Sequence, residues 1–186
     1  MRYSEDHKAH THRRIIEEAA ERFRRDGVGA TGLQPLMKAL GLTHGGFYAH
    51  FKSKDELVEE ALRAAADKLK ASSTELFAGA DPLPSFIESY LSERHRANPG
   101  AGCPLPTMSA ELGQRGQASP VTDEVVRDRL AAIEGALPGP DAADASVAML
   151  ATLVGALVLS RSVADPELSD RILATARRWL KQQASG

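Results

Sequence analysis

The chain has 186 residues, of which 42% are hydrophobic and 26% are charged. This length and composition are typical of one folded unit with an apolar core and argue against wholesale disorder. A single cysteine cannot form an internal disulfide, and the charged start lacks the apolar segment of a signal peptide, so we expect a cytoplasmic protein. The longest apolar stretch, residues 147–159, is shorter than the roughly 20 residues of a membrane-spanning helix. We therefore expect no membrane partner.

Charge is distributed unevenly along the chain. The net charge is −2, yet residues 1–54 carry ten Lys/Arg against six Asp/Glu, which gives +4 and leaves −6 for the remainder. Five of the six histidines also lie in the first part. This asymmetry predicts that the two parts of the chain have different partners, with nucleic acid a candidate for the basic part.

The sequence predicts an all-α fold of about nine helices. Prolines fall almost entirely between segments of helical periodicity, and no alternation typical of strands occurs. The expected helices cover residues 12–26, 33–40, 43–51, 53–77, 86–97, 104–112, 122–137, 141–163 and 166–183.

Start and stop signals define the first four helices. The first should end at Gly27, a residue typical of helix C-termini. Thr31 or Gly32 can cap the second helix, Thr43 the third and Ser53 the long fourth, because each can occupy the N-cap position.

The later helices form a larger body. The eighth is apolar on nearly all sides, so it must be covered on more than one face. It could line a pocket, form a subunit interface or pack within the core. The few charges on the seventh and eighth helices, beside a Pro/Gly/Cys loop, favour a mostly apolar ligand pocket there.

Residues 32–51 have the pattern helix, Gly41-Leu42 turn, helix, which is typical of a helix-turn-helix that lays its second helix in the DNA major groove. In the second helix Phe47 and Phe51 are four residues apart and can face the core. Glycines at positions 45 and 46 weaken a helix by ~1 kcal/mol each relative to alanine, and close approach to DNA is one reason for them. The residues left for the outer surface are Thr43, His44, Gly45, Tyr48 and His50.

The segment GLTHGGFYAHFKSKDEL, residues 41–57, resembles the signature of the tetracycline-repressor family. It combines the Gly-hydrophobic-Thr turn, a Gly and a Tyr in the recognition helix, a His-Phe pair and a Ser-Lys step that opens the next helix. The resemblance covers roughly residues 12–62. It implies an all-α homodimer and a transcriptional repressor that a small-molecule effector releases from a palindromic double-stranded DNA operator.

The resemblance also implies a division of the chain. A DNA-binding domain would cover residues 9–69, with its helix-turn-helix at 32–51, and an effector-binding and dimerisation domain would cover 70–186. The eighth and ninth helices would form the dimer contact, which small residues in the eighth would permit. The effector is expected to be largely apolar.

Carried over position by position, the resemblance implies contacts to both bases and phosphates. His44, Gly45 and Gln34 are expected at base edges. Phosphate contacts are expected from Thr43, Tyr48, His50 and Lys54. Such contacts position the protein on DNA without reading the base sequence. The complete set of expected DNA-binding residues is Gln34, Thr43, His44, Gly45, Gly46, Tyr48, His50, Lys52 and Lys54.

Cys103 precedes the expected sixth helix, whose N-terminus could lower the pKa of the thiol. A thiol-based electrophile or oxidant sensor is therefore an alternative to a residue that merely packs. A nucleophilic pair of Cys103 and His95 also stays open. Arg161 and the pair at 177–178 are expected to be solvated or rim charges, not ligand anchors.

Other classes of function have weaker support. His7, His10 and His12 could bind a metal, but no further ligands lie nearby, so no metal is expected. The sequence has no phosphate-binding glycine loop, HExxH or G-x-S-x-G, so we expect neither an enzyme nor a cofactor. A helical ligand carrier or adaptor without DNA binding is the alternative from another class.

Overall fold

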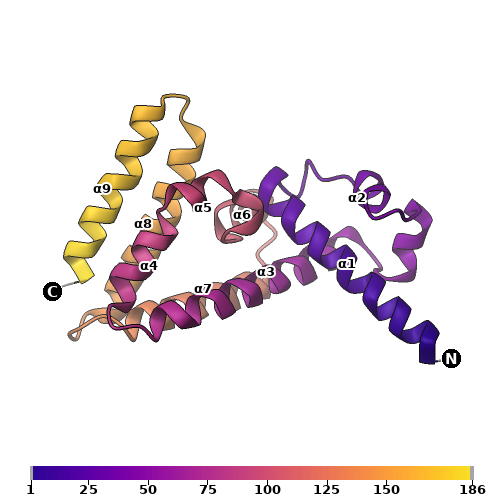
Figure 1. The fold of residues 1–186 in the computed structure, drawn as a ribbon, viewed down its shortest axis with the longest axis horizontal. Helices are drawn as coiled ribbons and strands as arrows, with labels where there is room; N and C mark the ends of the chain where they lie inside the picture. The colour runs from indigo at the N-terminus through magenta and orange to yellow at the C-terminus, as the bar shows by residue number, and fades with distance from the viewer. Residues whose placement is uncertain (1, 185–186) are drawn as a thin grey trace.

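The structure, a computed structural model, describes residues 2–184. These residues form nine α-helices and no strand (Figure 1). Residues 185–186 of the expected body lie outside this range. The all-α prediction is confirmed. The α-helices are α1 (Arg2–Asp26), α2 (Leu33–Ala39), α3 (Lys54–Phe77), α4 (Pro82–Tyr90), α5 (Glu93–Ala97), α6 (Ala110–Gln114), α7 (Pro120–Glu134), α8 (Ala142–Ser162) and α9 (Pro166–Ala184). Three short turns join them: the 3₁₀ turns η1 (His44–Ala49) and η2 (Pro99–Ala101) and the π-helical turn η3 (Leu105–Ser109).

Several expected helices have different forms in the structure. The third is the short 3₁₀ turn η1, and the sixth divides into η3 and α6. The fifth divides at Ser92, whose hydroxyl accepts the His95 N–H at 3.1 Å and so begins a new helix. The first helix starts ten residues earlier than expected, at Arg2, because no helix-breaking residue precedes His12.

The molecule is elongated, with α1 and α2 at one end and α8 and α9 at the other (Figure 1). The helix α3 runs between these ends, packs against α1 near its start and lies beside α4 and α7 farther along. We call α1, α2, η1 and the start of α3 the head, and the remainder the body. Because α3 is continuous through residues 69–70, the expected division falls inside one rigid helix.

The head has its own apolar core. Phe23 of α1, Met37 of α2 and Phe47 of η1 are completely buried. Thr31 does not cap α2; Gly32 holds the N-cap position, and the Thr31 hydroxyl donates to the carbonyl of Gly27 at 2.7 Å. The head is thus a compact three-helix unit whose second and third elements are short.

Helix α8 packs between α7 and α9 in the body. Leu153 and Leu157 are fully buried, and the buried hydroxyls of Ser146 and Ser160 donate to carbonyls of the same helix. With 21 residues and a mean hydropathy of 2.0, α8 is long and apolar enough to cross a membrane by length and composition. The apolar stretch at residues 147–159 is the middle of this helix, which extends beyond it at both ends, as the expected helix at 141–163 does. A core helix of a globular fold passes the same test.

Glu111 joins the head to the body. Its carboxylate, on α6, accepts the N–H groups of Val28 at 2.5 Å and Gly29 at 2.7 Å in the turn after α1. Gly27 opens this turn with φ +92°, and a Cβ there would lie 3.1 Å from the carboxylate. Arg115 binds the same carboxylate from the next turn of α6. We call this arrangement the Glu111 clasp; it fixes the turn between the first two helices to the body.

Candidate nucleic-acid interface

The turn η1 has an inner and an outer side, and its local hydrogen bonds set both. The Thr43 hydroxyl accepts the Gly46 N–H at 3.2 Å, as expected for an N-cap. Phe47 and Phe51 face inward and stack at 5.4 Å between ring centroids. Gly41, with φ +72°, supplies the reversal between α2 and η1. Anchored in this way, η1 presents its remaining side chains outward.

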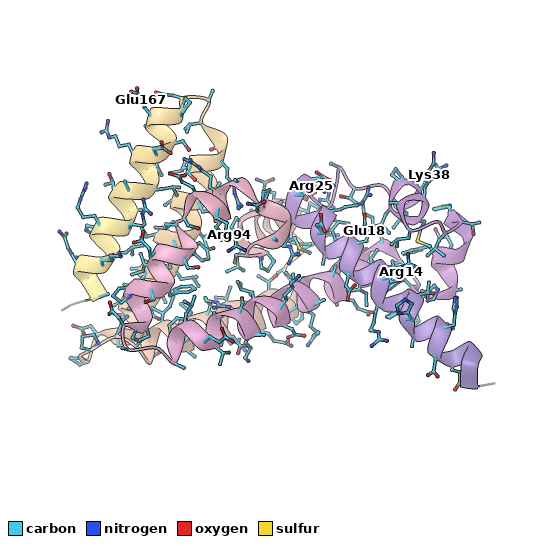
Figure 2. All side chains as sticks on the ribbon, viewed as in Figure 1. Arg14, Glu18, Arg25, Lys38, Arg94 and Glu167 are labelled. Carbon is cyan, nitrogen blue, oxygen red and sulfur yellow. The ribbon has the colours of Figure 1, made fainter. Side chains whose placement is uncertain are left out.

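The outer side of η1 carries most of the expected DNA-binding residues. The Tyr48 side chain is 62% exposed although it is large and aromatic, and its ring meets the edge of Phe47. Gln34 projects from the neighbouring α2 and is exposed too, as is Lys38, seen at the outer margin of the head in Figure 2. Further exposed residues of this surface are Thr43, His44, Gly45 and Lys52.

Internal packing does not explain Gly45. A Cβ built there would meet no heavy atom within 4 Å, and its backbone is not in the left-handed region. Gly46 differs, since its Cβ would lie 3.4 Å from the Thr43 hydroxyl oxygen. The absence of a side chain at position 45 therefore leaves an open, flat spot on the outer side of η1.

His50 is half-buried beside α1. Its Nδ1 atom is buried without a hydrogen-bond partner among the described residues. Burial, with smaller contributions from His12 and Lys8, lowers the pKa of the His50 imidazole. His12 itself stacks on Phe51 at 4.5 Å. His50 is thus neutral at pH 7 and can donate from one ring nitrogen only.

The structure gives Lys54 a different place from the one that the resemblance implies. Its ammonium donates to the carbonyls of Val28 at 2.6 Å and Thr31 at 2.7 Å. Burial lowers the pKa of this ammonium group. Two of its three donors therefore stabilise the same turn that the Glu111 clasp holds, instead of pointing outward. We attribute to Lys54 a role in holding the head together.

Cys103 and His95 lie together but are not a nucleophilic pair. The backbone N–H of Cys103 donates to His95 Nε2 at 3.0 Å, and His95 Nδ1 contacts the Tyr90 carbonyl at 2.7 Å. These two contacts require a neutral ring with its proton on Nδ1. Burial lowers the pKa of His95, which favours that form. The nitrogen that would take a thiol proton is therefore already occupied.

The geometry of Cys103 favours the packing residue over the alternative of a reactive thiol. The residue is buried, and burial raises the pKa of its thiol; the neighbouring Tyr90 hydroxyl opposes this shift only in part. The expected helix N-terminus is instead the π-helical turn η3. A buried thiol with a raised pKa is a packing residue, with little thiolate at neutral pH.

Alkylation of Cys103 by iodoacetamide at pH 7.5 is expected to be at least about 100-fold slower in the folded protein than in urea, because reaction requires both local opening and deprotonation. Mass spectrometry of timed samples measures both rates. Equal rates would restore the reactive-thiol interpretation.

One other residue, Arg161, was assigned wrongly from the sequence. Arg161 is not a solvated charge: its guanidinium donates to the carbonyls of His95 at 2.5 Å and Arg96 at 3.1 Å, near the end of α5. Arg177 forms an ion pair with Glu88 at 2.9 Å, which joins α9 to α4. Both arginines hold body helices together.

Within residues 2–184, no group of three or more His, Cys, Asp or Glu side chains could hold a metal ion. His7 and His10 are exposed on α1. The third histidine near the start of the chain, His12, forms a hydrogen bond with Glu60 at 3.0 Å and so connects α1 to α3.

Comparisons with known proteins agree with this geometry. A sequence model described as "Bacterial regulatory proteins, tetR family" matches residues 15–61, which span α1 to the first turns of α3. The chain is 29% identical over 160 residues to an uncharacterized HTH-type transcriptional regulator of Mycobacterium tuberculosis, covering 80% of this chain and 82% of the relative. It is 29% identical over 83 residues to the transcriptional repressor KstR2 of Rhodococcus jostii, covering 45% and 41%.

Solved structures share the fold over nearly the whole chain. The reduced form of E. coli NemR superposes with a TM-score of 0.76 at 19% identity, covering 92% of this chain and 95% of that one. PfmR of Thermus thermophilus, a TetR family transcriptional regulator, superposes with a TM-score of 0.59 at 26% identity, covering 93% and 98%. From the matched head and the related regulators, we conclude that residues 15–61 form a head of the tetR family of bacterial regulatory proteins and that the chain is a DNA-binding transcriptional regulator.

Proposed function

We propose that the outer side of η1, with the exposed start of α2, is the surface by which a cytoplasmic homodimer of this chain binds a palindromic operator and represses transcription until a small molecule binds the body. The head, residues 9–69, is the DNA-binding domain, and residues 70–186 bind the effector and the second subunit. No catalytic role is included.

Each residue of this surface has a chemical role in the proposal. The Thr43 hydroxyl uses a lone pair to cap η1, which leaves its proton for a phosphate oxygen. Tyr48, Lys52 and the one N–H of neutral His50 are further phosphate donors. His44 and Gln34 read base edges, since both can donate and accept hydrogen bonds.

The observation that carries the proposal is the open position at Gly45. A glycine in a short helical turn is unfavourable by ~1 kcal/mol relative to alanine, and no contact within the protein requires it. Flanked by exposed His44 and half-buried Gly46, it lets the backbone of η1 approach a groove edge closely.

The dimer contact in this proposal is the outer face of α8 and α9. Val147 is 53% and Leu159 is 55% exposed on α8, and Trp179 is 46% exposed on α9. Leu153 and Leu157 are buried within the subunit. An apolar surface of this kind favours association with a second copy.

Gly45→Ala tests the proposal. We expect the variant to fold with equal or higher stability, because the position has room and alanine favours helices. We expect its operator affinity to fall about tenfold or more, since the new methyl group stands where DNA approaches. The control is Gly113→Ala on α6, which also has open space around it and should bind DNA as the parent does.

The measurement is fluorescence anisotropy with the DNA upstream of the protein's own gene, at several salt concentrations, together with urea unfolding of each variant. His44→Ala should change the preferred sequence, whereas Tyr48→Phe should weaken binding to all sequences alike. Parent-like affinity of Gly45→Ala would contradict the proposed surface. A parent that binds this DNA no better than random DNA would favour a ligand carrier or adaptor.

A further inference from the structure

The body contains a cleft of about 460 Å³ between α1, α3, α4 and α5, which we call the inner cleft. None of its lining residues belongs to α7 or α8, where the sequence favours a pocket. It opens between exposed residues of α3 and α5, and its deeper wall includes the buried side chains of Phe86 and Tyr90. This volume is in the range typical of small-molecule sites.

Charge in the inner cleft has one sign. Arg24, Lys68 and Arg94 line it, and its described lining residues include no Asp or Glu. Arg94 extends from α5 toward α3 (Figure 2). Serine hydroxyls line the cleft too, but those of Ser72, Ser73 and Ser92 already donate to backbone carbonyls. The positive side chains are therefore its main donors.

One buried polar side chain in this cleft lacks a partner. Arg24 is 5% exposed, and its Nε atom has no hydrogen-bond partner among the described residues. Tyr90 is 4% exposed, and its hydroxyl lies beside the Cys103 thiol. No hydrogen bond or ion pair holds the Arg24 guanidinium within the described chain. Burial lowers the pKa of Arg24, and the Glu21 carboxylate opposes this shift only in part. Buried polar groups normally find partners, so the Arg24 guanidinium lacks an acceptor.

More positive charge lies behind the wall. Arg129 of α7 is buried, donates to the Ser73 hydroxyl at 2.9 Å and lies 5.6 Å from the centroid of the Phe86 ring. Its Nε atom is also without a partner. Ser73 and Phe86 are both lining residues, so the cleft is positive at its mouth and beyond its base.

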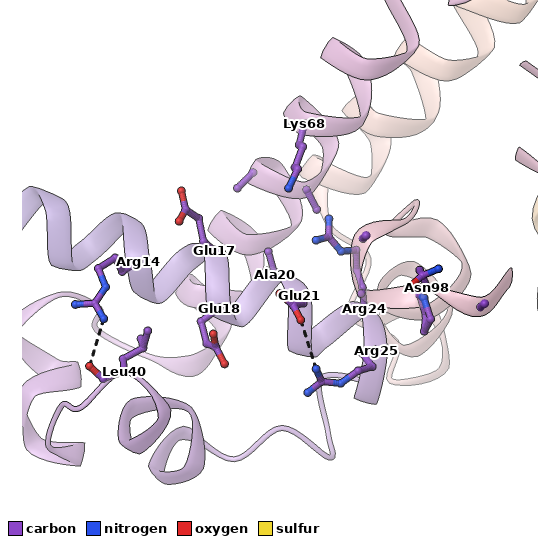
Figure 3. A pocket seen from close by; sticks show the side chains of 16 residues that line it. Arg14, Glu17, Glu18, Ala20, Glu21, Arg24, Arg25, Leu40, Lys68 and Asn98 are labelled. Atoms are coloured by element: carbon purple, nitrogen blue, oxygen red, sulfur yellow. Dashed lines mark hydrogen bonds and ion pairs between the residues drawn. The ribbon is translucent and has the colours of Figure 1, made fainter. Parts of the chain in front are cut away.

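The inner cleft meets a second, outer cleft of about 860 Å³ at the junction of head and body (Figure 3). Arg24 and Lys68 line both. Figure 3 shows Arg24 of α1 and Lys68 of α3 extending toward the same part of this space. The outer cleft also has three carboxylates: Glu18 pairs with Arg22 and Glu21 with Arg25, whereas Glu17 has no ion pair among the described residues. Arg24 of α1 is therefore a head residue whose side chain lines the cleft inside the body.

We infer that the inner cleft binds an organic anion, an apolar body with one carboxylate or phosphate group, and that Arg24 and Lys68 hold that group. Leu69, Leu76 and Phe86 supply apolar surface for the rest of the molecule. The effector of the proposed function is thus anionic instead of simply apolar. This inference rests on the proposed function only in making the anion the effector that releases DNA. Binding of the anion itself needs no DNA.

The position of Arg24 suggests how such a ligand acts. An anion bound between Arg24 of α1 and Lys68 of α3 connects these two helices. It thereby changes the equilibrium between different arrangements of α1 and α3. The anion can weaken DNA binding only to the extent that it binds the arrangement that does not fit DNA more tightly than the arrangement that does.

The test is equilibrium dialysis of the full chain without DNA against four probes with the same ten-carbon chain: decanoate, decyl phosphate, 1-decanol and decyltrimethylammonium, below their micelle concentrations. We expect decanoate or decyl phosphate to bind, and their ratio identifies the preferred group. The alcohol and the cation should bind at least about tenfold more weakly, because each lacks the charge-assisted hydrogen bonds.

Arg24→Gln and Lys68→Gln should each weaken anion binding about tenfold or more. Lys68 is exposed, so its replacement leaves folding intact. Matched controls are Lys70→Gln on α3, whose parent side chain pairs with Asp128 instead, and Arg13→Gln on the exposed side of α1; both should bind as the parent does. Arg24→Gln should also melt at the same or a higher temperature, which a structural arginine would not allow.

Three results would overturn the inference: equal binding of the alcohol or the cation, anion binding that survives both Arg24→Gln and Lys68→Gln, or no binding of either anion at 1 mM. Failure of the parent to bind operator DNA would overturn the proposed function alone, because dialysis without DNA does not depend on it.

Discussion

Leu159→Glu should produce a monomer that has lost most of its affinity for the operator. Leu159 lies on the outer face of α8 and is 55% exposed in the single subunit. In the proposed dimer a carboxylate there would be buried against apolar side chains of the partner without a counter-charge, which strongly disfavours association. A monomer holds only one half-site. It thereby loses the effective concentration that ties the second head to DNA, a loss of about 10²- to 10⁴-fold.

Ala71→Glu is the matched control, because it places the same charge on an exposed position of α3 outside the proposed interface. Light scattering gives the oligomeric state, and anisotropy gives the operator affinity. Both variants should keep the parent's helical circular dichroism. A dimeric Leu159→Glu protein would show that α8 does not form the contact.

Glu111→Ala is expected to lower the free energy of unfolding by about 2–3 kcal/mol and to weaken operator binding. The substitution removes an acceptor that two backbone N–H groups share, those of Val28 and Gly29. Hydrogen bonds to charged groups contribute about 1.5–3 kcal/mol each, and partial exposure of the turn reduces the sum. The operator affinity should fall because the head is then held less firmly at the angle required by the groove.

Arg115→Gln separates the two interactions of the Glu111 carboxylate. It removes the exposed ion pair with Arg115 but leaves both backbone hydrogen bonds, so its effect should stay below about 1 kcal/mol. Urea unfolding and amide hydrogen exchange at Val28 and Gly29 measure the outcome. Unchanged exchange at these two amides in Glu111→Ala would refute the clasp.

Local patterns predict the helices of this protein well because their causes are local. Thr43 and Ser53 both cap the elements that follow them, with hydrogen bonds to the N–H groups of Gly46 and Glu56, as their positions in the sequence suggest. The burial of Phe47 and Phe51 also follows from their spacing. The 3₁₀ form of η1 could not be predicted, since a six-residue segment with two glycines has no strong preference.

Contacts between distant residues were beyond the reach of the sequence. Glu111 lies 83 residues from Val28, and Arg161 lies 66 residues from His95. Nothing in the neighbourhood of either side chain indicates its partner, because packing of whole helices decides it. The same holds for Arg24: its periodic position on α1 predicts burial no better than exposure, and the missing partner becomes visible only in the folded chain.

The Glu111 clasp limits how freely heads of this fold can be exchanged. A chimera that joined residues 2–69 to the body of a relative would place the turn at residues 27–31 against a different α6. Without a carboxylate at the matching position, the N–H groups of Val28 and Gly29 would lose their acceptor. In the reverse chimera, with the head of a relative on this body, Glu111 would face a turn shaped for other contacts. A working graft would therefore have to carry residues 110–115 along with the head, although they lie about 40 residues beyond it in the sequence.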